Sequence, residues 1–468
     1  MARDFSPDSP WAIYSPDRTA PWDLRRAVHL RHRAGFAATW SELQRDLQDG
    51  PQRSIDRFLS GKARTDGVPD DFDAGAAQLG EAINAARGNM LNGGGSTHLK
   101  AWWVYRMLFG PDPLTERLTL MWHNHFGTSV EKVRDISLMR RQNETFRRHA
   151  RAPFDKLLTA CLHEPALLVW LDAPANRKGH PNENLARELM ELFTLGIGHY
   201  SESDVKQGAR ALTGWTVSGR EFRENNQLHD DGEKQLLGRK GRWKGDDFVR
   251  LLLEHPATAE RLAWRLCGTF MGEGAVDQNA RKALASGLRE RRLDIAWGVE
   301  TVLRSKAFFA EANLGTRAAA PPEYVVGAVR ALEMFDPPPS TVLLADWSAR
   351  LGQDLFAPPN VGGWPGGRVW VSVQAAVARA NYAAALVGGR LTRGGQPFDA
   401  LGLAQKHSRG KTLDDLIDFF GELLSGATPG PAWRERVASA LGSKAALTSK
   451  AARRAAALIL ASPEIQLA

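Results

Sequence analysis

The side chains with the clearest chemical potential are imidazoles and carboxylates in two separate segments. The run Trp122-His123-Asn124-His125 places two imidazoles two residues apart, and the stretch 183–195 carries two carboxylates three residues apart. Imidazole and carboxylate groups together bind divalent transition metals and exchange protons near neutral pH. The sequence therefore predicts one polar site that could hold such a metal. Its predicted ligands are His123, His125, Glu188 and Glu191.

Three of the side chains in these segments are predicted to act directly on a substrate. His123 and Glu188 are candidate proton-transfer groups, and Arg187 would orient an acid or bind an anionic group. His123 shares a helical face with Glu116, seven residues earlier, and His125 joins that face only if the helix ends near Asn124. The alternative is a helix terminus at which both imidazoles hydrogen-bond to backbone carbonyls.

The second segment also has a purely structural interpretation. Glu183, Arg187 and Glu191 follow one another at four-residue intervals, which suits a ladder of ion pairs on one helical face. Glu188 is harder to explain in this way because it lies nearer the apolar side of the helix. A buried carboxylate requires an arginine, a histidine or a metal as a partner.

Polar and aromatic residues around these segments are candidates for binding a cofactor. They are Asn182 and Asn184 in the loop before the second segment, and Trp215 after it. The alternative for the amides is capping, with Asn182 as the N-cap of a helix over 183–195 that stops at Gly196. Trp364 and Trp370 are expected to form an aromatic wall, although most of the chain's 15 tryptophans would fill cores.

Several well-known site patterns are missing from the sequence. Neither segment contains Glu-x-x-His, which argues against a ferritin-like di-iron centre. The zinc signatures His-Glu-x-x-His and Cys-x-x-Cys, the Walker loop, Gly-x-Ser-x-Gly and Gly-x-Gly-x-x-Gly are also absent. Phosphate-cradling NTPases, α/β-hydrolases and classical dinucleotide enzymes are therefore disfavoured.

Composition places the 468-residue chain among ordinary globular proteins with a basic balance. Its formal net charge is +8, and 43% of its residues are hydrophobic. No apolar run approaches the roughly 20 residues needed to cross a bilayer. The N-terminus has no apolar signal-peptide region, so we expect a cytoplasmic protein. Cys161 and Cys267 are expected to be two buried thiols.

The densest basic stretch runs from Lys132 to Arg151 and includes interleaved acids. Its apolar residues recur at helical spacing, which predicts an amphipathic helix with a solvated face. A nucleic-acid groove is the alternative, and it is disfavoured because no nucleic-acid recognition motif accompanies the charge.

Hydrophobic periodicity predicts a mainly α fold, with many helices packed as an orthogonal or bundle-like domain and one small β-hairpin excursion. A strong helix is expected over 113–126, with Pro113 in its first turn. Six regions are predicted along the chain. They are an N-terminal helical region (1–98), a central site region (99–214), the hairpin (215–245), a helical region (246–336), a Pro/Gly-rich loop (337–370) and a C-terminal helical region (371–468).

Several motifs resemble those of a bacterial family catalogued as domain of unknown function 1800. The matching pieces are HLRHRAGFAAT (29–39), ERLTLMWHNHF (116–126), HEPALLVWLD (163–172), PNENLARELMELFTLG (181–196), SDVKQGARALTGW (203–215), HDDGEKQLLG (229–238), HPATAERLAWRL (255–266) and FAPPNVGGWPGG (356–367). The resemblance implies a mostly helical fold but no established activity. Many relatives are exported, and some carry His where this chain has Phe193. The resemblance also implies a partner from an alkaline-phosphatase-like family, domain of unknown function 1501.

Two hypotheses about function follow from these observations. In the first, the protein is a metal-dependent oxidoreductase or hydrolase that uses the His/Glu site. In the second, it is a non-catalytic binding or maturation partner, in which the Asn/Glu/His cluster is a buried hydrogen-bond network that fixes helix packing.

Overall fold

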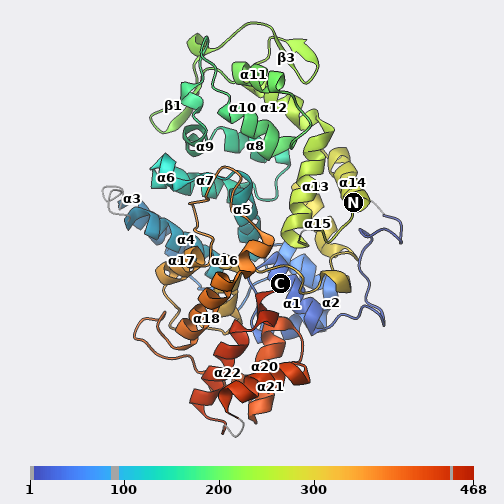
Figure 1. Ribbon diagram of the computed structural model, residues 1–468, viewed down its shortest axis with the longest axis vertical. Helices are drawn as coiled ribbons and strands as arrows, with labels where there is room; N and C mark the ends of the chain where they lie inside the picture. Colours follow the sequence, from blue (N-terminus) through green and yellow to red (C-terminus); the bar gives the residue numbers. More distant parts are fainter. Residues whose placement is uncertain (1–4, 86–93, 273, 443–445, 468) are drawn as a thin grey trace.

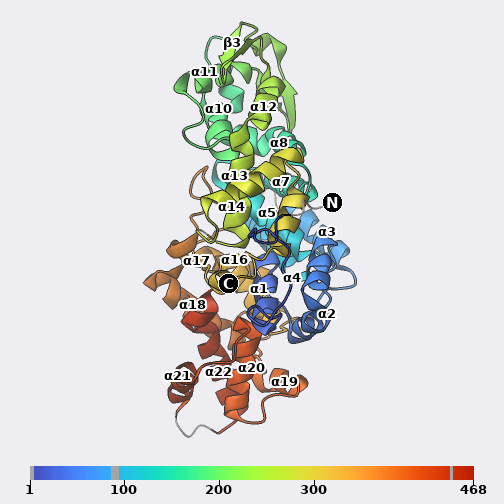
Figure 2. The same ribbon diagram turned by 90° about the vertical axis from the view of Figure 1, so that its right-hand side faces the viewer.

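The computed structural model describes residues 5–85, 94–272, 274–442 and 446–467. The molecule is elongated, with the hairpins and α10–α12 at one end and α19–α22 at the other (Figures 1 and 2). Helices α1, α5, α13 and α16 lie in the middle third (Figure 1). The predicted mainly α fold with a small hairpin excursion is confirmed.

Helices account for most of the chain up to the hairpins. They are α1 (Leu24–Ala34), α2 (Trp40–Leu59), α3 (Phe72–Ala85), α4 (Gly94–Phe109), α5 (Pro113–His125), α6 (Val130–Val133), α7 (Ile136–Arg148), α8 (Phe154–Leu162), α9 (Pro165–Trp170), α10 (Asn184–Glu188) and α11 (Glu202–Ala211). A π-helical turn, η3 (Leu189–Thr194), follows α10, and the 3₁₀ turn η2 (Ala173–Ala175) precedes it.

Helices resume after the hairpins and continue to the C-terminus. They are α12 (Gly245–Glu254), α13 (Pro256–Phe270), α14 (Gln278–Glu290), α15 (Ile295–Arg304), α16 (Pro321–Ala331), α17 (Thr341–Arg350), α18 (Val373–Val387), α19 (Ala400–Lys406), α20 (Leu413–Ser425), α21 (Pro431–Leu441) and α22 (Ser449–Ala461). The 3₁₀ turns are η4 (Asn226–Leu228), η5 (Glu311–Asn313), η6 (Gly367–Val371) and η7 (Pro463–Gln466).

The β structure consists of two successive antiparallel hairpins. Strand β1 (Trp215–Ser218) pairs with β2 (Glu221–Glu224), and β3 (Lys234–Leu236) pairs with β4 (Arg239–Gly241). Gly219 and Gly238 have φ values of 61° and 79° in the two turns, a region that suits glycine. One predicted excursion is thus built from two short hairpins.

Two hydrophobic clusters form the interior, and α1 and α5 contribute to both. Leu30 of α1 and Leu118 of α5 lie in the cluster built mostly from α8–α15, whereas Val28 and Leu120 lie in the cluster built mostly from α16–α22. These two helices therefore occupy the junction between the two cores. The division into six regions stays a prediction.

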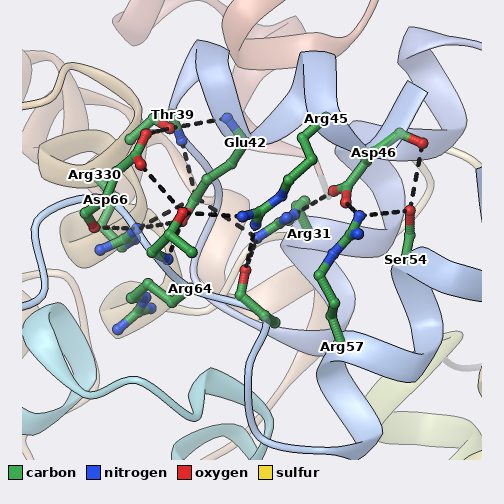
Figure 3. A network of polar contacts seen from close by, with 12 residues as sticks. Arg31, Thr39, Glu42, Arg45, Asp46, Ser54, Arg57, Arg64, Asp66 and Arg330 are labelled. Carbon is green, nitrogen blue, oxygen red and sulfur yellow. Dashed lines mark hydrogen bonds and ion pairs between the residues drawn. The ribbon is translucent and has the colours of Figure 1, made fainter. Parts of the chain in front are cut away.

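A buried ionic network ties α1 and α2 to α16 (Figure 3). Glu42 accepts hydrogen bonds from Arg330 at 3.3 Å and lies 3.6 Å from the Arg31 guanidinium. Asp46 pairs with both Arg31 and Arg57. Burial raises the pKa of Glu42, but Arg330 and Arg31 outweigh it and lower that pKa to about 2. Both carboxylates of this network are therefore paired with arginines of the protein itself.

Two further expectations concern the membrane and the cysteines. Within the described part of the chain, no helix is both long and apolar enough to cross a bilayer. Cys161 and Cys267 are both buried and free, so the prediction of two buried thiols is confirmed.

Candidate functional site

Helix α5 carries the first predicted segment, and it begins as the sequence indicates. Pro113 occupies its first turn, and the Asp112 carboxylate accepts a hydrogen bond from the Thr115 N–H at 3.0 Å. The helix continues through His125 before it ends at Phe126. Residues two positions apart in an α-helix are separated by about 200° around its axis. His123 and His125 therefore point to different surroundings. They do not share one face.

His123 lies in an aromatic enclosure. Its ring centroid is 5.2 Å from that of Trp103, 5.0 Å from Phe356 and 5.4 Å from Trp364. Neither of its ring nitrogens makes a hydrogen bond of normal geometry within the described residues. Burial lowers the pKa of His123 to about 3, so the imidazole is neutral at physiological pH.

His125 faces the second predicted segment instead. Its Nε2–H donates a hydrogen bond of 3.0 Å to the carbonyl of Phe193, whose ring lies 6.0 Å from the imidazole. This contact matches the alternative in which an imidazole satisfies a backbone carbonyl. It also places Phe193 directly against His125.

The predicted helix over 183–195 is present, but its second half is π-helical. The α-helical part ends at Glu188, and a π-helical turn follows in which the Leu195 N–H donates to the carbonyl of Met190, five residues earlier. A π turn rotates the following side chains away from their α-helical positions. The predicted ladder of Glu183, Arg187 and Glu191 is broken for this reason. Gly196 ends the element at φ 84°, as expected.

The charged residues of this segment make separate contacts. Arg187 pairs with Glu183 at 2.9 Å and with Glu202 of α11 at 2.7 Å. Glu191 accepts a hydrogen bond of 2.7 Å from the Tyr200 hydroxyl. Glu188 is half-buried, and burial together with the neighbouring Glu191 carboxylate raises its pKa.

The predicted cofactor-binding residues mainly complete local structure. The Asn182 side chain accepts from the Asn184 N–H at 3.0 Å, so it forms a turn one residue before Glu183, which is the N-cap of α10. The Asn184 amide donates to Asp172 at 3.0 Å. Trp215 is only 2% exposed and packs edge-on against both His163 and Phe222.

These positions do not assemble into a metal centre. Across the described residues, no three His, Cys, Asp or Glu side chains are grouped so that they could hold a metal ion. Aromatic rings surround His123, and Nε2 of His125 is already hydrogen-bonded to the backbone carbonyl of Phe193. The four predicted ligands therefore do not fit a shared ion in this arrangement.

The basic stretch 132–151 is largely neutralised by acids of the protein itself. Arg147 pairs with Glu116, Arg151 with Asp112, and Arg141 with Glu164 and Glu221. Glu116 also accepts from the Trp103 indole at 3.2 Å. The stretch thus serves helix packing in the part of the chain that the structure describes.

In a different region of the molecule, positive charge exceeds the negative charge of the described residues around it. A cleft of about 780 Å³ lies between α5, α13 and the segment that leads through η6 into α18. We call it the arginine cleft, and the side chains that define it are Arg117, Asn124, Arg261, Trp264, Arg265, Arg317, Glu323, Trp364, Arg368, Trp370 and Val371. Among the described residues that line it, five are arginines and Glu323 alone is acidic.

Paired charges form the floor of the arginine cleft. Glu323 bonds with Arg117 of α5 and with Arg317, and the Arg117 guanidinium also donates to the carbonyl of Thr269 at 3.2 Å. Burial raises the pKa of Glu323, but the two arginines outweigh it and lower that pKa to about 2. Arg33 is fully buried nearby, and burial followed by the Arg317 charge lowers its pKa well below the ordinary value.

One wall of the arginine cleft is a sandwich of two arginines and a tryptophan on α13. The guanidinium carbons of Arg261 and Arg265 lie 4.6 Å and 5.0 Å from the Trp264 ring centroid. Arg261 also donates to the carbonyl of Leu192 in the π turn at 3.2 Å. Arg265 forms no ion pair with any described carboxylate, and its Nε–H is shielded from solvent without a partner. Burial and then Arg261 lower its pKa to about 9.

The opposite wall is fastened to α5 by the predicted tryptophan loop. The Asn124 side chain accepts a hydrogen bond of 2.7 Å from the backbone N–H of Trp364. The Trp364 indole donates a hydrogen bond of 3.1 Å to the backbone carbonyl of Asp354. Gly363, at φ 88°, lets the chain approach closely, since a Cβ there would lie 2.2 Å from the Asn124 side chain. Trp364 and Trp370 both line the cleft, where the sequence predicted an aromatic wall.

The arrangement favours binding over proton transfer. Apart from the arginines, Glu323 is the sole ionisable side chain among the described lining residues. A carboxylate with a pKa of about 2 is a weak general base at neutral pH. Guanidinium groups, in contrast, bind carboxylates and phosphates with two parallel hydrogen bonds.

The prediction from sequence missed most of this cleft. Within HPATAERLAWRL, Trp264 lies three residues after Arg261 and Arg265 lies four residues after it. The motif itself therefore signalled a basic, aromatic helical face. No comparable signal linked that face to Arg117, Arg317 and Arg368, which come from distant segments.

Comparison with known proteins finds one family model, described as "Protein of unknown function (DUF1800)", that matches residues 29–467. No curated protein and no solved structure matches the chain.

Proposed function

We propose that this chain, which belongs to the DUF1800 family of unknown function, is a binding protein that holds an anionic ligand in the arginine cleft. The observation that carries the proposal is Arg265, which lines the cleft, has no acidic partner among the described residues and holds its Nε–H out of solvent without a hydrogen bond. A shielded charge is costly unless it is paired, because burial removes its hydration. An anion that enters the cleft would supply the missing partner.

The surroundings of Arg265 support a ligand with more than one negative charge. Arg261 lies beside it on α13, and Arg368 is exposed on the opposite wall. Arg117 and Arg317 share the one carboxylate of Glu323. Anions that match this charge are di- or tricarboxylates and pyrophosphate-like groups, which accept hydrogen bonds from several guanidinium groups at once.

The test is isothermal titration calorimetry of the wild type with pyrophosphate and with citrate at low ionic strength. We expect binding that weakens as salt is added, because screening reduces the attraction between charges. Arg265→Gln should weaken binding about 10- to 100-fold, the equivalent of one charge-assisted hydrogen-bonded pair. Arg265→Lys should restore part of that loss, since it keeps the charge without the planar fork.

The matched control is Arg250→Gln on α12, which removes an exposed arginine paired with Asp247 outside the cleft. It lowers the net charge by the same amount and should leave affinity unchanged. Equal losses in Arg265→Gln and Arg250→Gln would show non-specific attraction to a basic protein and would reject the proposal.

The metal-dependent activity predicted from the sequence remains a second candidate. The observation in its favour is His123, whose two ring nitrogens lack a hydrogen bond of normal geometry within the described residues. Elemental analysis of wild type and His123→Ala tests it, since a ligand role requires stoichiometric metal that the folded variant loses. An equal metal content in both proteins would exclude His123 as a ligand.

The partner predicted from the family resemblance, an alkaline-phosphatase-like protein of domain of unknown function 1501, also remains a proposal. A binding protein is compatible with such a partner, and purification of the two chains together tests it. A complex that resists Arg265→Gln would place that interaction outside the arginine cleft.

A further inference from the structure

Exposed apolar side chains are concentrated at the arginine cleft. Ten large apolar side chains of the described residues are exposed, and six of them lie in the cleft or just beyond it. The six are Trp264, Val369, Val371, Val373, Val377 and Leu467. Single exposed apolar residues are ordinary, but a contiguous group marks a binding surface.

Four of these side chains belong to one short segment, residues 369–377, which leaves the cleft at Val371. Val371 lines the cleft and is 45% exposed, and Val373 and Val377 are 84% and 57% exposed. Val373 and Val377 lie four residues apart in α18, so they share one helical face. We call Val369, Val371, Val373 and Val377 the valine strip. It begins at Val371 in the lining of the arginine cleft and continues onto the exposed start of α18.

We infer that the ligand of the arginine cleft is an acidic, aliphatic segment of a partner protein, with carboxylates in the cleft and apolar side chains on the valine strip. This inference rests on the proposed function and names its ligand class. Carboxylates complement Arg265 and Arg368, and aliphatic side chains complement the exposed valines. A peptide carries both groups on one chain.

The dimensions suit such a segment. Val373 and Val377 are separated by about 6 Å along the helix axis, given a rise of about 1.5 Å per residue. An extended peptide advances about 3.3 Å per residue and turns alternate side chains to one face. An advance of about two residues therefore spans the distance from Val373 to Val377, with aliphatic side chains at alternate positions.

Other anionic ligands fit fewer of these features. A bilayer surface is flat and cannot reach the shielded guanidinium of Arg265 inside a cleft. Nucleic acid presents phosphates and bases that suit the arginines and Trp264 of the cleft, but it leaves the exposed valines without an aliphatic partner. A free small anion leaves the valine strip uncovered.

The experiment measures binding of fluorescein-labelled synthetic peptides by fluorescence anisotropy. The main probe alternates Glu and Leu, and two companions of equal length alternate Glu with Ser and Gln with Leu. Wild type is expected to bind the Glu/Leu peptide at least tenfold more tightly than either companion. Equal affinity for the Glu/Leu and Glu/Ser peptides would overturn the inference, and this comparison requires no mutant.

The paired variants separate the strip from the cleft. Val373→Ser combined with Val377→Ser should weaken the Glu/Leu peptide about five- to tenfold and leave pyrophosphate binding unchanged. Val342→Ser combined with Leu343→Ser removes two other exposed apolar side chains, on α17, and should change neither affinity. Equal peptide affinity of the valine variant and wild type would contradict the inference.

Three further outcomes keep this inference distinct from the proposed function. If pyrophosphate binds in an Arg265-dependent manner and no peptide binds, the ligand class is wrong and the anion-binding function stands. If phosphatidylglycerol vesicles or a single-stranded oligonucleotide bind more tightly than the Glu/Leu peptide, the inference is also overturned. If Arg265→Gln leaves pyrophosphate binding intact, the proposed function itself fails.

Discussion

The buried ionic network and the arginine cleft use the same side chain in opposite ways. In the network, Arg31 and Arg330 are at most 2% exposed and each meets a carboxylate of α2 (Figure 3). In the cleft, the Nε–H of Arg265 is shielded from solvent and the side chain meets no described carboxylate. Arginine content alone therefore does not distinguish structural from binding roles. Pairing and access together do, because Arg33 is also buried without an ion pair to a described residue but does not line the cleft.

Acidification should produce the largest effect, and it acts on the buried groups rather than on the arginines. Burial lowers the pKa values of His29, His123 and His125 below the ordinary 6.5. Below pH 6.5 the unfolded chain then binds more protons than the folded one, so the free energy of unfolding falls as pH falls. Each histidine lowers the free energy of unfolding by up to roughly 1.4 kcal/mol for each pH unit of acidification, so the three together lower it by up to about 4 kcal/mol per pH unit.

Urea unfolding from pH 7 down to pH 4 measures this loss. His29→Phe removes one buried imidazole beside Phe308 and should shift the acid transition to lower pH. The exposed His180→Phe should leave the transition unchanged. A stability that is flat between pH 6.5 and pH 4 would show that these imidazoles are charged in the native state.

Removing the central acid of the network should give the next largest loss. Glu42→Gln leaves Arg31 and Arg330 without that carboxylate in a water-excluded site, at an expected cost of about 3–5 kcal/mol. Glu183→Gln breaks a partly exposed pair with Arg187 and should cost less than about 1 kcal/mol. Denaturant unfolding of both variants measures the difference, and similar costs would remove the distinction between buried and exposed pairs.

Matched arginine substitutions sharpen the comparison further. Arg330→Gln should lower the free energy of unfolding by about 3 kcal/mol or more, because it leaves Glu42 with fewer partners. Arg265→Gln should change it by less than about 1 kcal/mol while ligand affinity falls, since no ion pair with a described residue is lost. A large loss of stability in Arg265→Gln would show that Arg265 is a structural residue.

Ligand-induced stabilisation should be the smallest effect. Pyrophosphate at about ten times its dissociation constant should raise the free energy of unfolding by about 1.4 kcal/mol through mass action. Thermal unfolding of wild type, Glu42→Gln and Arg265→Gln measures it. Glu42→Gln should keep the pyrophosphate-induced increase in the free energy of unfolding, and Arg265→Gln should lose it. Loss of the increase in both variants would mean that the buried ionic network and the arginine cleft are coupled.

Local patterns predicted the fold better than the site. The start of α5 at Pro113 and the stop at Gly196 depend on a ring-constrained φ and on a positive φ that glycine tolerates, so a short window suffices. The π turn of η3 was missed because the same residues also fit an α-helical pattern. What distinguishes the two is tertiary, since the carbonyls of Phe193 and Leu192 accept from His125 and Arg261.

The arginine cleft could not be assembled from the sequence for a related reason. Its guanidinium groups come from positions 117, 261, 265, 317 and 368, and spacing says nothing about which distant segments meet. Trp364 was recognised as a wall residue because Gly and Pro around it exclude regular structure. The metal-ligand set failed to converge because helix α5 continues through His125 and turns the two imidazoles apart.

The hydrogen bond between Arg330 and Glu42 spans 288 residues of chain. At a synthesis rate of about 5–20 residues per second, α16 is made roughly 15 to 60 s after α2. During that interval the carboxylate of Glu42 has Arg31 beside it, and its partner from α16 has not yet been made. The first helices of this protein therefore reach their final electrostatic state only late in translation, and a nascent chain stalled before α16 should stay sensitive to protease.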